Sequence, residues 1–260
     1  MKPKVQFKKV RSTGEIFEDS ILFLKQNFKP LLKAYAIICG FFILASAILA
    51  GIYQVGVGNP FAPRNTDLGP SYFLMICFML LSMLFTWLTT LSYIALYDID
   101  RQPPTVEEVW SYVKYYFWRM LGSTFLLSIL LMVGFLLCLL PGVYLLPIFS
   151  LALVIIVLDN TSLFYALNQS FKLIKSNWGN LFGLMLAAFF LIAATHLLAL
   201  IVCMIPPGIL VFLIGKHELT IMSVAFVVVT NLVQFFYMLI IIAVSMFYFS
   251  LTENAVNSAL

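Results

Sequence analysis

The chain has 260 residues, of which 63% are hydrophobic and 10% are charged, with a formal net charge of +4 at pH 7. Soluble domains carry about 25% charged residues. A chain of this length cannot bury so much apolar surface in a water-soluble core, so the composition excludes a soluble globular protein and predicts an all-α integral membrane protein.

The N-terminal segment, MKPKVQFKKVRST, is basic but has no apolar core and no small-residue cleavage site. We therefore expect no cleavable signal peptide. Ser12 and Glu15 have the spacing of a capping box, which predicts that a helix begins here. The charges of this segment favour anionic lipid as a partner, and we expect no nucleic-acid binding.

Six segments contain enough apolar residues to cross a membrane, which takes about 20 residues. They are residues 31–53, 71–97, 120–140, 143–158, 181–204 and 220–251. Pro141 and Gly142 predict a tight turn between the third and fourth segments, and the Gly- and Pro-rich stretch 53–70 predicts an irregular loop.

The lysines and arginines of the connections lie mainly on one side of these spans. Thirteen fall in the segment ending at Lys33 and in the connections 98–119 and 159–180, whereas the other side has only Arg64 and Lys216. Cytoplasmic connections are enriched in Lys and Arg, so both termini are predicted to lie in the cytoplasm.

A polar stretch at residues 158–182, LDNTSLFYALNQSFKLIKSNWGNLF, separates two apolar segments. Its large apolar residues recur every three or four positions, and its polar residues lie off that face. This pattern is typical of an amphipathic helix in the headgroup region, with lysines toward anionic lipid. The apolar positions are Leu163, Leu167, Phe171, Ile174 and Trp178; Asn168, Gln169, Lys172 and Lys175 are the polar ones.

Two parts of the chain repeat at a constant offset of 150 residues. SILFLKQNFKPLL (20–32) matches SFKLIKSNWGNLF (170–182), and a looser third copy is TVEEVWSYVKYYFWRMLG (105–122), which begins with the capping-box pair Thr105 and Glu108. The aligned pairs are Ser20/Ser170, Lys25/Lys175, Asn27/Asn177, Phe28/Trp178 and Leu31/Leu181, and the third copy contributes Trp110 and Trp118.

We therefore predict a single membrane domain, 1–260, built from three units at 12–98, 105–159 and 161–253. Each unit would be a cytoplasmic interfacial amphipathic helix followed by a hairpin of two transmembrane helices that ends in Asp98, Asp159 or Glu253. The alternative is that membrane proteins generally place amphipathic, aromatic-rich linkers on their cytoplasmic side.

Residues 139–186 combine an LPG.Y turn, a short span that ends in an acid, and an AL..S..L...NW helix. This stretch resembles the membrane domain of bacterial glycerophosphodiester phosphodiesterases and the related stand-alone six-span membrane proteins. The matching positions are Pro141, Gly142, Tyr144, Asp159, Ala166, Leu167, Ser170, Asn177 and Trp178.

In the fused enzymes of this family, catalysis belongs to a separate soluble barrel domain. The resemblance therefore implies no catalytic residue in this chain. It implies a lipid-linked role, and we expect the prokaryotic cytoplasmic (inner) membrane as the location.

His196 is the one ionisable side chain predicted to lie within a span. Counted by helical rise, it lies about 22 Å from the cytoplasmic end of the fifth span, and Gln234 and Asn231 lie at about 25 and 30 Å along the sixth. A hydrogen bond between His196 and Gln234 across a helix interface is expected. The alternative is a polar lining for a lipid headgroup or a proton step.

Thr86, Thr89 and Thr90 lie along one side of the second span, which Tyr93 continues. Hydroxyl side chains on such a face more often join helices than line a groove, and we expect packing here. A groove that contacts a lipid headgroup is the alternative.

The sequence contains none of the motifs GxxxxGK[ST], HExxH and GxSxG, so we expect no enzymatic activity, no cofactor and no metal. The acid pairs Asp98/Asp100 and Glu107/Glu108 are expected to be solvated capping groups. The four cysteines lie in apolar segments without CxxC spacing and are expected to be small buried side chains: Cys39, Cys77, Cys138 and Cys203.

Three functional classes agree with these features. The first is a non-enzymatic membrane protein with a lipid-linked role, in lipid handling or envelope homeostasis, whose partner is membrane phospholipid. The second is a scaffold or subunit that docks a protein partner on its cytoplasmic face. The third is a passive transporter, because no acid or base is predicted at the membrane centre to couple ions.

Overall fold

The computed structural model describes residues 5–57, 69–137, 139–214, 229–231 and 233–257, and within these ranges it contains helices and no strand. Six helices are long and apolar enough to cross a membrane, which confirms the prediction of a helical multi-pass membrane protein. The elements are α1 (Thr13–Gln26), α2 (Phe28–Val57), α3 (Pro70–Asp100), α4 (Val106–Leu137), α5 (Leu139–Leu158), α6 (Leu163–Ile174), α7 (Trp178–Ile214), the 3₁₀ turn η2 (Val233–Tyr237) and α9 (Met238–Asn257).

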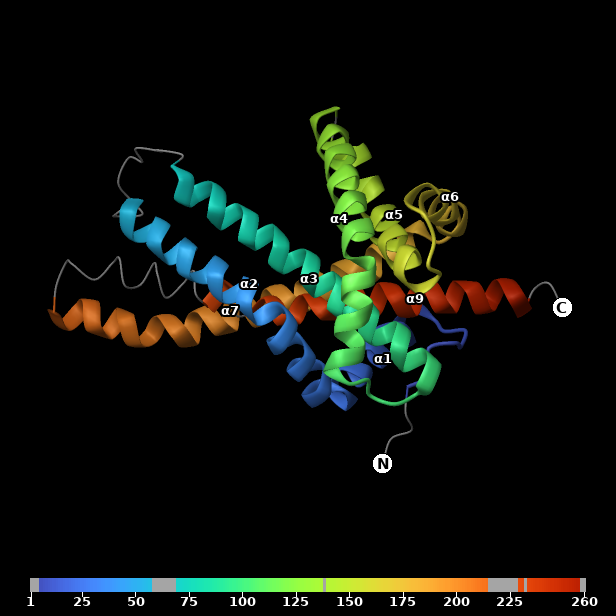
Figure 1. Ribbon diagram of the computed structural model, residues 1–260, viewed down its shortest axis with the longest axis horizontal. Coiled ribbons are helices and arrows are strands. Elements are labelled where there is room, and N and C mark those ends of the chain that lie inside the picture. Colours follow the sequence, from blue (N-terminus) through green and yellow to red (C-terminus); the bar gives the residue numbers. More distant parts are fainter. Residues whose placement is uncertain (1–4, 58–68, 138, 215–228, 232, 258–260) are drawn as a thin grey trace. The chain divides into compact units, whose positions relative to one another are not determined.

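The helices belong to two compact units, which we describe separately. The first comprises residues 1–36, 86–189 and 238–260, and the second comprises residues 37–85 and 190–237. In the first unit, α4 and α6 pack against α5, while α1 and α5 pack against α9 (Figure 1). Helices α5 and α9 are apolar on all sides, so they occupy its centre, with 151–157 and 241–250 buried.

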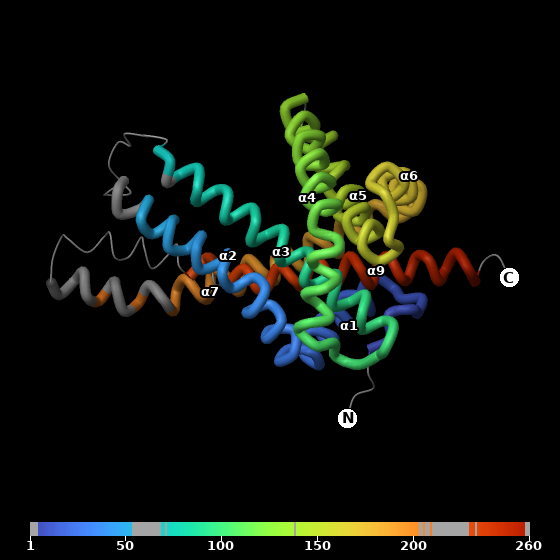
Figure 2. Tube along the Cα trace, viewed as in Figure 1, coloured from blue at the N-terminus to red at the C-terminus, as the bar shows by residue number. Residues whose placement is uncertain are grey.

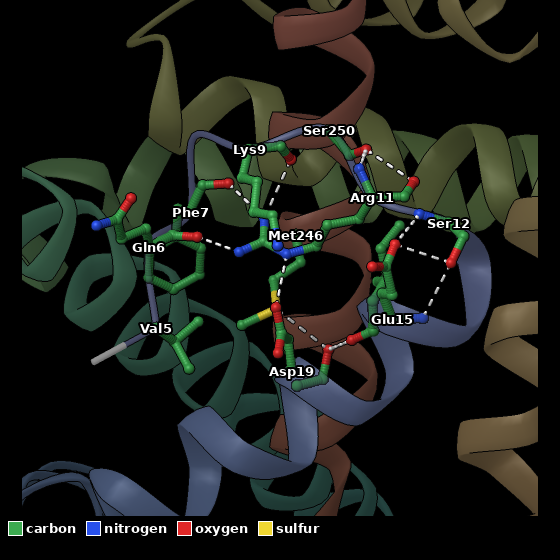
Figure 3. A network of polar contacts seen from close by, with 12 residues as sticks. Val5, Gln6, Phe7, Lys9, Arg11, Ser12, Glu15, Asp19, Met246 and Ser250 are labelled. Carbon is green, nitrogen blue, oxygen red and sulfur yellow. Dashed lines mark hydrogen bonds and ion pairs between the residues drawn. The ribbon is translucent and has the colours of Figure 1, made fainter. Parts of the chain in front are cut away.

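The segment before α1 is fixed to the first unit by an aromatic side chain and a buried charge. The Phe7 ring lies against Phe23, Tyr97 and Phe249 at centroid distances of 5.0, 6.0 and 5.3 Å. The Arg11 side chain is 1% exposed; its Nε donates to Asp19 Oδ2 at 2.7 Å and its Nη1 to the Phe7 carbonyl at 2.8 Å (Figure 3).

This segment is also tied to α9 and α3. The Arg11 backbone N–H donates to Ser250 Oγ at 2.9 Å, and Lys8 Nζ lies 2.9 Å from Asp98 Oδ2. Arg11 therefore pairs inside the protein, whereas Lys8 pairs with Asp98 at the surface with 57% of its side chain exposed; a contact of this segment with anionic lipid stays a prediction. A buried guanidinium needs an internal carboxylate and carbonyl acceptors, and the folded segment supplies both.

In the second unit, α2 and α3 contact each other through aromatic rings. Phe42 stacks on Phe85 with centroids 4.2 Å apart and an interplanar angle of 15°, and Tyr53 lies 5.3 Å from Tyr72. Cys39 is buried as expected, but Cys77 is exposed because it lies on a face of α3 that none of the described helices of this unit covers. Cys138 and the side chain of Cys203 lie outside the described residues.

The first and third copies of the repeat have matching helix boundaries. Ser12 and Ser162 are the N-cap residues of α1 and α6, and Phe28 and Trp178 are the first residues of α2 and α7. The helix breaks fall at Asn27 and at 175–177. Buried positions also match at the offset of 150, as in Ser20/Ser170, Leu31/Leu181 and Ala34/Leu184. Helix boundaries and buried positions thus correspond in these two stretches, and the organisation into three units stays a prediction.

The second copy differs, because α4 runs without a break from Val106 to Leu137 (Figure 2). The prediction of a separate interfacial helix at 105–122 is therefore wrong. Copies one and three carry Asn27 and Asn177 at the break, and asparagine competes for backbone hydrogen bonds. Helix α4 contains no asparagine between Val106 and Leu137, so this alternative to helical bonding is absent from it.

The predicted turn at Pro141 and Gly142 is also displaced. Both residues lie in the first turn of α5, which begins at Leu139, where proline is tolerated because the first N–H groups of a helix have no partner in the helix. Gly142 lies close to α4, since a Cβ there would come within 2.3 Å of the Phe135 ring. The missing side chain lets α4 and α5 approach. Most of the predicted loop, 58–68, lies outside the described residues.

Candidate functional site: a tyrosine cleft on α4

The polar residues predicted within the sixth span lie in the second unit and join neighbouring helices. Gln234 is buried, and it exchanges hydrogen bonds with Ser82 of α3: its Nε2 donates to Ser82 Oγ at 3.1 Å, and Ser82 Oγ lies 3.2 Å from Gln234 Oε1. Asn231 Oδ1 accepts from Ser46 Oγ of α2 at 2.8 Å. Both pairs link transmembrane segments.

The predicted pairing of His196 with Gln234 is therefore not the one observed. His196 Nδ1 lies 3.0 Å from the Ile192 carbonyl of its own helix, and its ring centroid lies 5.8 Å from that of Tyr237. The depth count assumed a continuous α-helix through the sixth span, whereas Gln234 lies in η2. A 3₁₀ turn has a different rise and rotation per residue, so it directs Gln234 toward Ser82.

The three threonines of α3 lie in packed surroundings in the first unit. Thr86, Thr89 and Thr90 are each at most 1% exposed. Thr90 Oγ1 donates to the Thr86 carbonyl at 2.8 Å, and Thr86 Oγ1 lies 3.5 Å from the Tyr35 hydroxyl. These contacts favour the packing interpretation over a groove.

The residues predicted for the interfacial helices have different surroundings. Lys25, Lys172 and Lys175 are exposed, and so are Phe28, Trp110 and Trp118, the last at 76%. Trp178 instead packs within the first unit: its Nε1 donates to the Tyr144 carbonyl at 3.0 Å, and its ring stacks between Tyr144 and Phe182.

A cleft of about 400 Å³ lies beside the N-terminal half of α4, within the first unit. We call it the tyrosine cleft; it is lined by Ser111, Tyr112, Tyr115, Tyr116 and Asn160. The α4 residues lie at helical intervals of three and four, which places them on one side of the helix. Asn160 approaches from the connection between α5 and α6.

Arg119 lies beside this cleft, one turn after Tyr115, and contacts three of its lining residues. Its guanidinium carbon lies 5.9 Å from the Tyr115 ring centroid and 5.6 Å from that of Tyr116. Nη1 donates to Asn160 Oδ1 at 2.7 Å. Asn160 has a φ of 52°, a left-handed conformation that asparagine adopts more readily than most residues. Two ring faces and an amide oxygen therefore hold the guanidinium in place.

The length of α4 places the cleft at the level of lipid headgroups. Its 32 residues span about 48 Å, whereas the hydrocarbon core of a bilayer is about 30 Å thick. The polar N-terminal turns must therefore extend beyond the hydrocarbon, while the apolar part after Arg119 crosses it.

The face of α4 that carries the cleft continues into this apolar part. Leu126, Leu130 and Val133 follow Arg119 by 7, 11 and 14 residues, so they lie on the same side of the helix, and all three are exposed. We call these three residues the α4 stripe. A cationic, hydroxyl-rich cleft thus adjoins an exposed apolar surface.

This arrangement is suited to binding a charged group. A guanidinium and three phenol hydroxyls can donate hydrogen bonds to a phosphate, and tyrosine faces attract cations. Among the described residues, no three His, Cys, Asp or Glu side chains gather to hold a metal.

Sequence reasoning missed this cleft, since it counted Arg119 only as a positive charge. The spacing of Tyr112, Tyr115, Tyr116 and Arg119 was the available signal. The contribution of Asn160, 41 residues after Arg119, depends on how α5 folds back along α4. No family model, no curated protein and no solved structure matches the chain.

Proposed function

We propose that this chain is a non-enzymatic multi-pass membrane protein that handles phospholipid, and that the tyrosine cleft holds the headgroup of one lipid molecule. The observation that carries the proposal is the continuity of two surfaces on α4. The cleft offers a fixed guanidinium and phenol hydroxyls at headgroup level, and the α4 stripe offers apolar contact to an acyl chain.

The headgroup contributes most of the selectivity in this proposal. An acyl chain on the α4 stripe exchanges contacts with other lipid chains for similar contacts with leucine and valine, so its net gain is small. A phosphate at Arg119 gains charge-assisted hydrogen bonds from a guanidinium that is already positioned by Asn160 and two tyrosine rings.

The proposal includes location and orientation. We place both termini in the cytoplasm of a prokaryotic cell, with the chain in the cytoplasmic (inner) membrane and the cleft in its inner leaflet. Helices α1 and α6 then lie at the cytoplasmic interface. The resemblance of residues 139–186 to the membrane domain of glycerophosphodiester phosphodiesterases agrees with a lipid-linked role.

Native mass spectrometry of protein released gently from its own membrane tests this proposal. We expect the wild type to retain phospholipid in fixed stoichiometry and Arg119→Gln to lose it. Lys114→Gln is the matched control, because Lys114 is also an α4 cation over an aromatic ring, but its ring, that of Trp110 at 5.9 Å, is not part of the cleft.

A second variant tests whether Arg119→Gln loses lipid only because it changes the local structure. Tyr112→Leu leaves the Arg119–Asn160 hydrogen bond in place and should also reduce lipid retention. Retention by both variants at the wild-type level would refute the cleft as the lipid site. A stoichiometric protein companion without lipid would instead support the scaffold alternative.

A further inference from the structure

We infer that the lipid held in the tyrosine cleft is a zwitterionic phospholipid whose headgroup ends in an ammonium group, with its phosphate at Arg119 and its ammonium toward Glu108. This inference rests on the proposed function and deepens it. It follows from the order in which charges and rings occur along one face of α4.

Glu108, Tyr112, Tyr115 and Arg119 share that face, since they are separated by four, three and four residues. By helical rise, the Cα atoms of Glu108 and Arg119 are about 16 Å apart. The acid is at the outer, N-terminal end of the helix, and the arginine is at the inner end, next to the α4 stripe. The face is therefore negative outside, aromatic in the middle and positive inside.

A zwitterionic phospholipid has the complementary order. Its phosphate is bonded to the glycerol that carries the acyl chains, and its ammonium is at the free end of the headgroup. With the chains on the α4 stripe, the phosphate meets Arg119 first and the ammonium extends toward the water. Both charges of the lipid then face protein groups of opposite sign.

Tyr112 is the ring best placed for the ammonium. Arg119 already lies over Tyr115 and Tyr116, whereas Tyr112 lies one turn farther out, with its centroid 6.2 Å from that of Tyr116. A cation over a tyrosine face is attracted by the ring quadrupole. Glu108, one turn beyond Tyr112, adds a negative charge on the same side.

Other charged groups near the cleft do not reverse this order. Glu107 and Lys114 lie on other sides of α4, and Asp159, next to Asn160, accepts a hydrogen bond from the Tyr248 hydroxyl. The Glu108 carboxylate is held at the helix start, because its Oε2 accepts from the Thr105 backbone N–H at 2.7 Å. A headgroup with an anionic or neutral free end gains nothing from Glu108.

The test measures lipid preference with two lipids that differ at the free end of the headgroup. The purified chain is equilibrated in mixed micelles of phosphatidylethanolamine and phosphatidylglycerol at equal concentration, and retained lipid is identified by native mass spectrometry. We expect phosphatidylethanolamine to be enriched about fivefold, as one partly exposed cation–ring contact and one nearby charge would give.

Glu108→Gln is the diagnostic variant. Glutamine also fills the capping-box position, so the helix start is preserved while the negative charge is removed. We expect the preference to fall to about twofold, because the contact with the Tyr112 ring remains, and lipid should still be retained, since Arg119 holds the phosphate. Glu107→Gln is the control, because it removes the same charge from the neighbouring residue on another face, and it should keep the wild-type preference.

The outcomes separate this inference from the proposed function. Equal retention of both lipids by the wild type, with loss in Arg119→Gln, would overturn the inference and leave the lipid site standing. No retention of either lipid by the wild type would overturn both. An equal loss of preference in Glu107→Gln and Glu108→Gln would show that the preference depends on general surface charge, and would also overturn the inference.

Discussion

The first and third copies of the repeat place their helices alike but secure them differently. Helix α6 packs against α5, which precedes it by four residues, so the chain itself keeps the two together. Helix α1 packs against α9, more than two hundred residues away. Closing so long a loop costs more entropy, and the segment before α1 adds contacts of Arg11 and Phe7 with α9 that have no counterpart among the described residues before α6.

Arg11 shows this difference most clearly. Its side chain bonds to Asp19 and to three backbone carbonyls, and its main chain exchanges hydrogen bonds with Ser250 of α9. The position 150 residues later is Thr161, whose hydroxyl lies 3.5 Å from the Ile155 carbonyl of α5. The two helices thus correspond in position, but α1 is held by contacts of a buried charge and α6 by its short connection to α5.

Arg11→Ala should have the largest effect, lowering the free energy of unfolding by about 3 kcal/mol, because it leaves buried acceptors and Asp19 without their partner. Thermal unfolding in detergent measures the loss, and limited proteolysis should show earlier cleavage before α1.

The matched control is Thr161→Ala, which should change the unfolding temperature little. Equal effects of the two substitutions would contradict the view that the first copy depends on its polar contacts more than the third does.

Asn27→Ala should have the next largest effect, about 2 kcal/mol. Asn27 is 2% exposed, accepts from the Tyr93 hydroxyl at 3.1 Å and donates to the Phe23 carbonyl at 3.1 Å. Its counterpart Asn177 is half-buried and donates to Ser176 Oγ, so Asn177→Ala should cost much less. Unfolding in a denaturant series would measure both.

The Tyr93→Phe variant completes this comparison. It removes the hydroxyl that Asn27 accepts from, so adding Asn27→Ala to it should cost less than Asn27→Ala alone. Additive losses would mean that the Asn27–Tyr93 hydrogen bond contributes nothing to stability.

The sequence predicted those features of the two copies that depend on local pattern. The apolar spans and the capping boxes of Ser12 and Thr105 are encoded within a few residues, and the structure agrees with them. The buried face of α6 was only partly predicted. Its fully buried residues are Ala166, Ser170 and Ile174, and the small side chains of the first two let α6 approach α5.

Features that depend on partners far apart in sequence could not be predicted. Arg11 was counted as a surface charge because Ser250 is 239 residues away. A hydrogen bond between Gln234 and His196 was predicted because the 3₁₀ turn η2 was not foreseen. The cleft was missed because it forms only when Asn160 comes beside Arg119. In each case the sequence shows a polar residue but does not show which residue it contacts.

The capping boxes offer a third, smaller contrast. Glu15 Oε2 accepts from the Ser12 backbone N–H at 2.8 Å, and Ser12 Oγ accepts from the Glu15 N–H. In the third copy, Ser162 makes no side-chain capping bond, and the position that would need an acid is occupied by Tyr165. Ser12→Ala should cost about 1 kcal/mol and Ser162→Ala much less. Thermal unfolding at neutral pH compares them.

The same capping box predicts a pH dependence. The hydrogen bonds from the backbone N–H and then the hydroxyl of Ser12 lower the pKa of Glu15. Its contribution to stability is therefore complete above the pKa of an unfolded glutamate and is lost as the pH falls through the lowered value. Wild type and Glu15→Gln should differ in unfolding temperature at neutral pH and converge in acid; a constant difference would contradict this.

The smallest expected effect concerns the paired serines that face α9 and α5. Ser20 Oγ donates to the Ile16 carbonyl at 2.6 Å and lies 3.4 Å from Met246 Sδ, whereas Ser170 Oγ is buried with no hydrogen-bond partner among the described residues. Ser20→Ala should cost about 0.5 kcal/mol, and Ser170→Ala should be neutral or slightly stabilising, because it removes an unpaired buried hydroxyl.

Size should matter at both serines even where the hydroxyl does not. Each side chain is completely buried, so Ser20→Leu and Ser170→Leu should both destabilise the protein by overpacking. Unfolding measurements on the four variants separate volume from hydrogen bonding. If Ser170→Ala were as costly as Ser20→Ala, the third copy would depend on a polar contact as the first does, and the contrast between a covalent connection and polar contacts would fail.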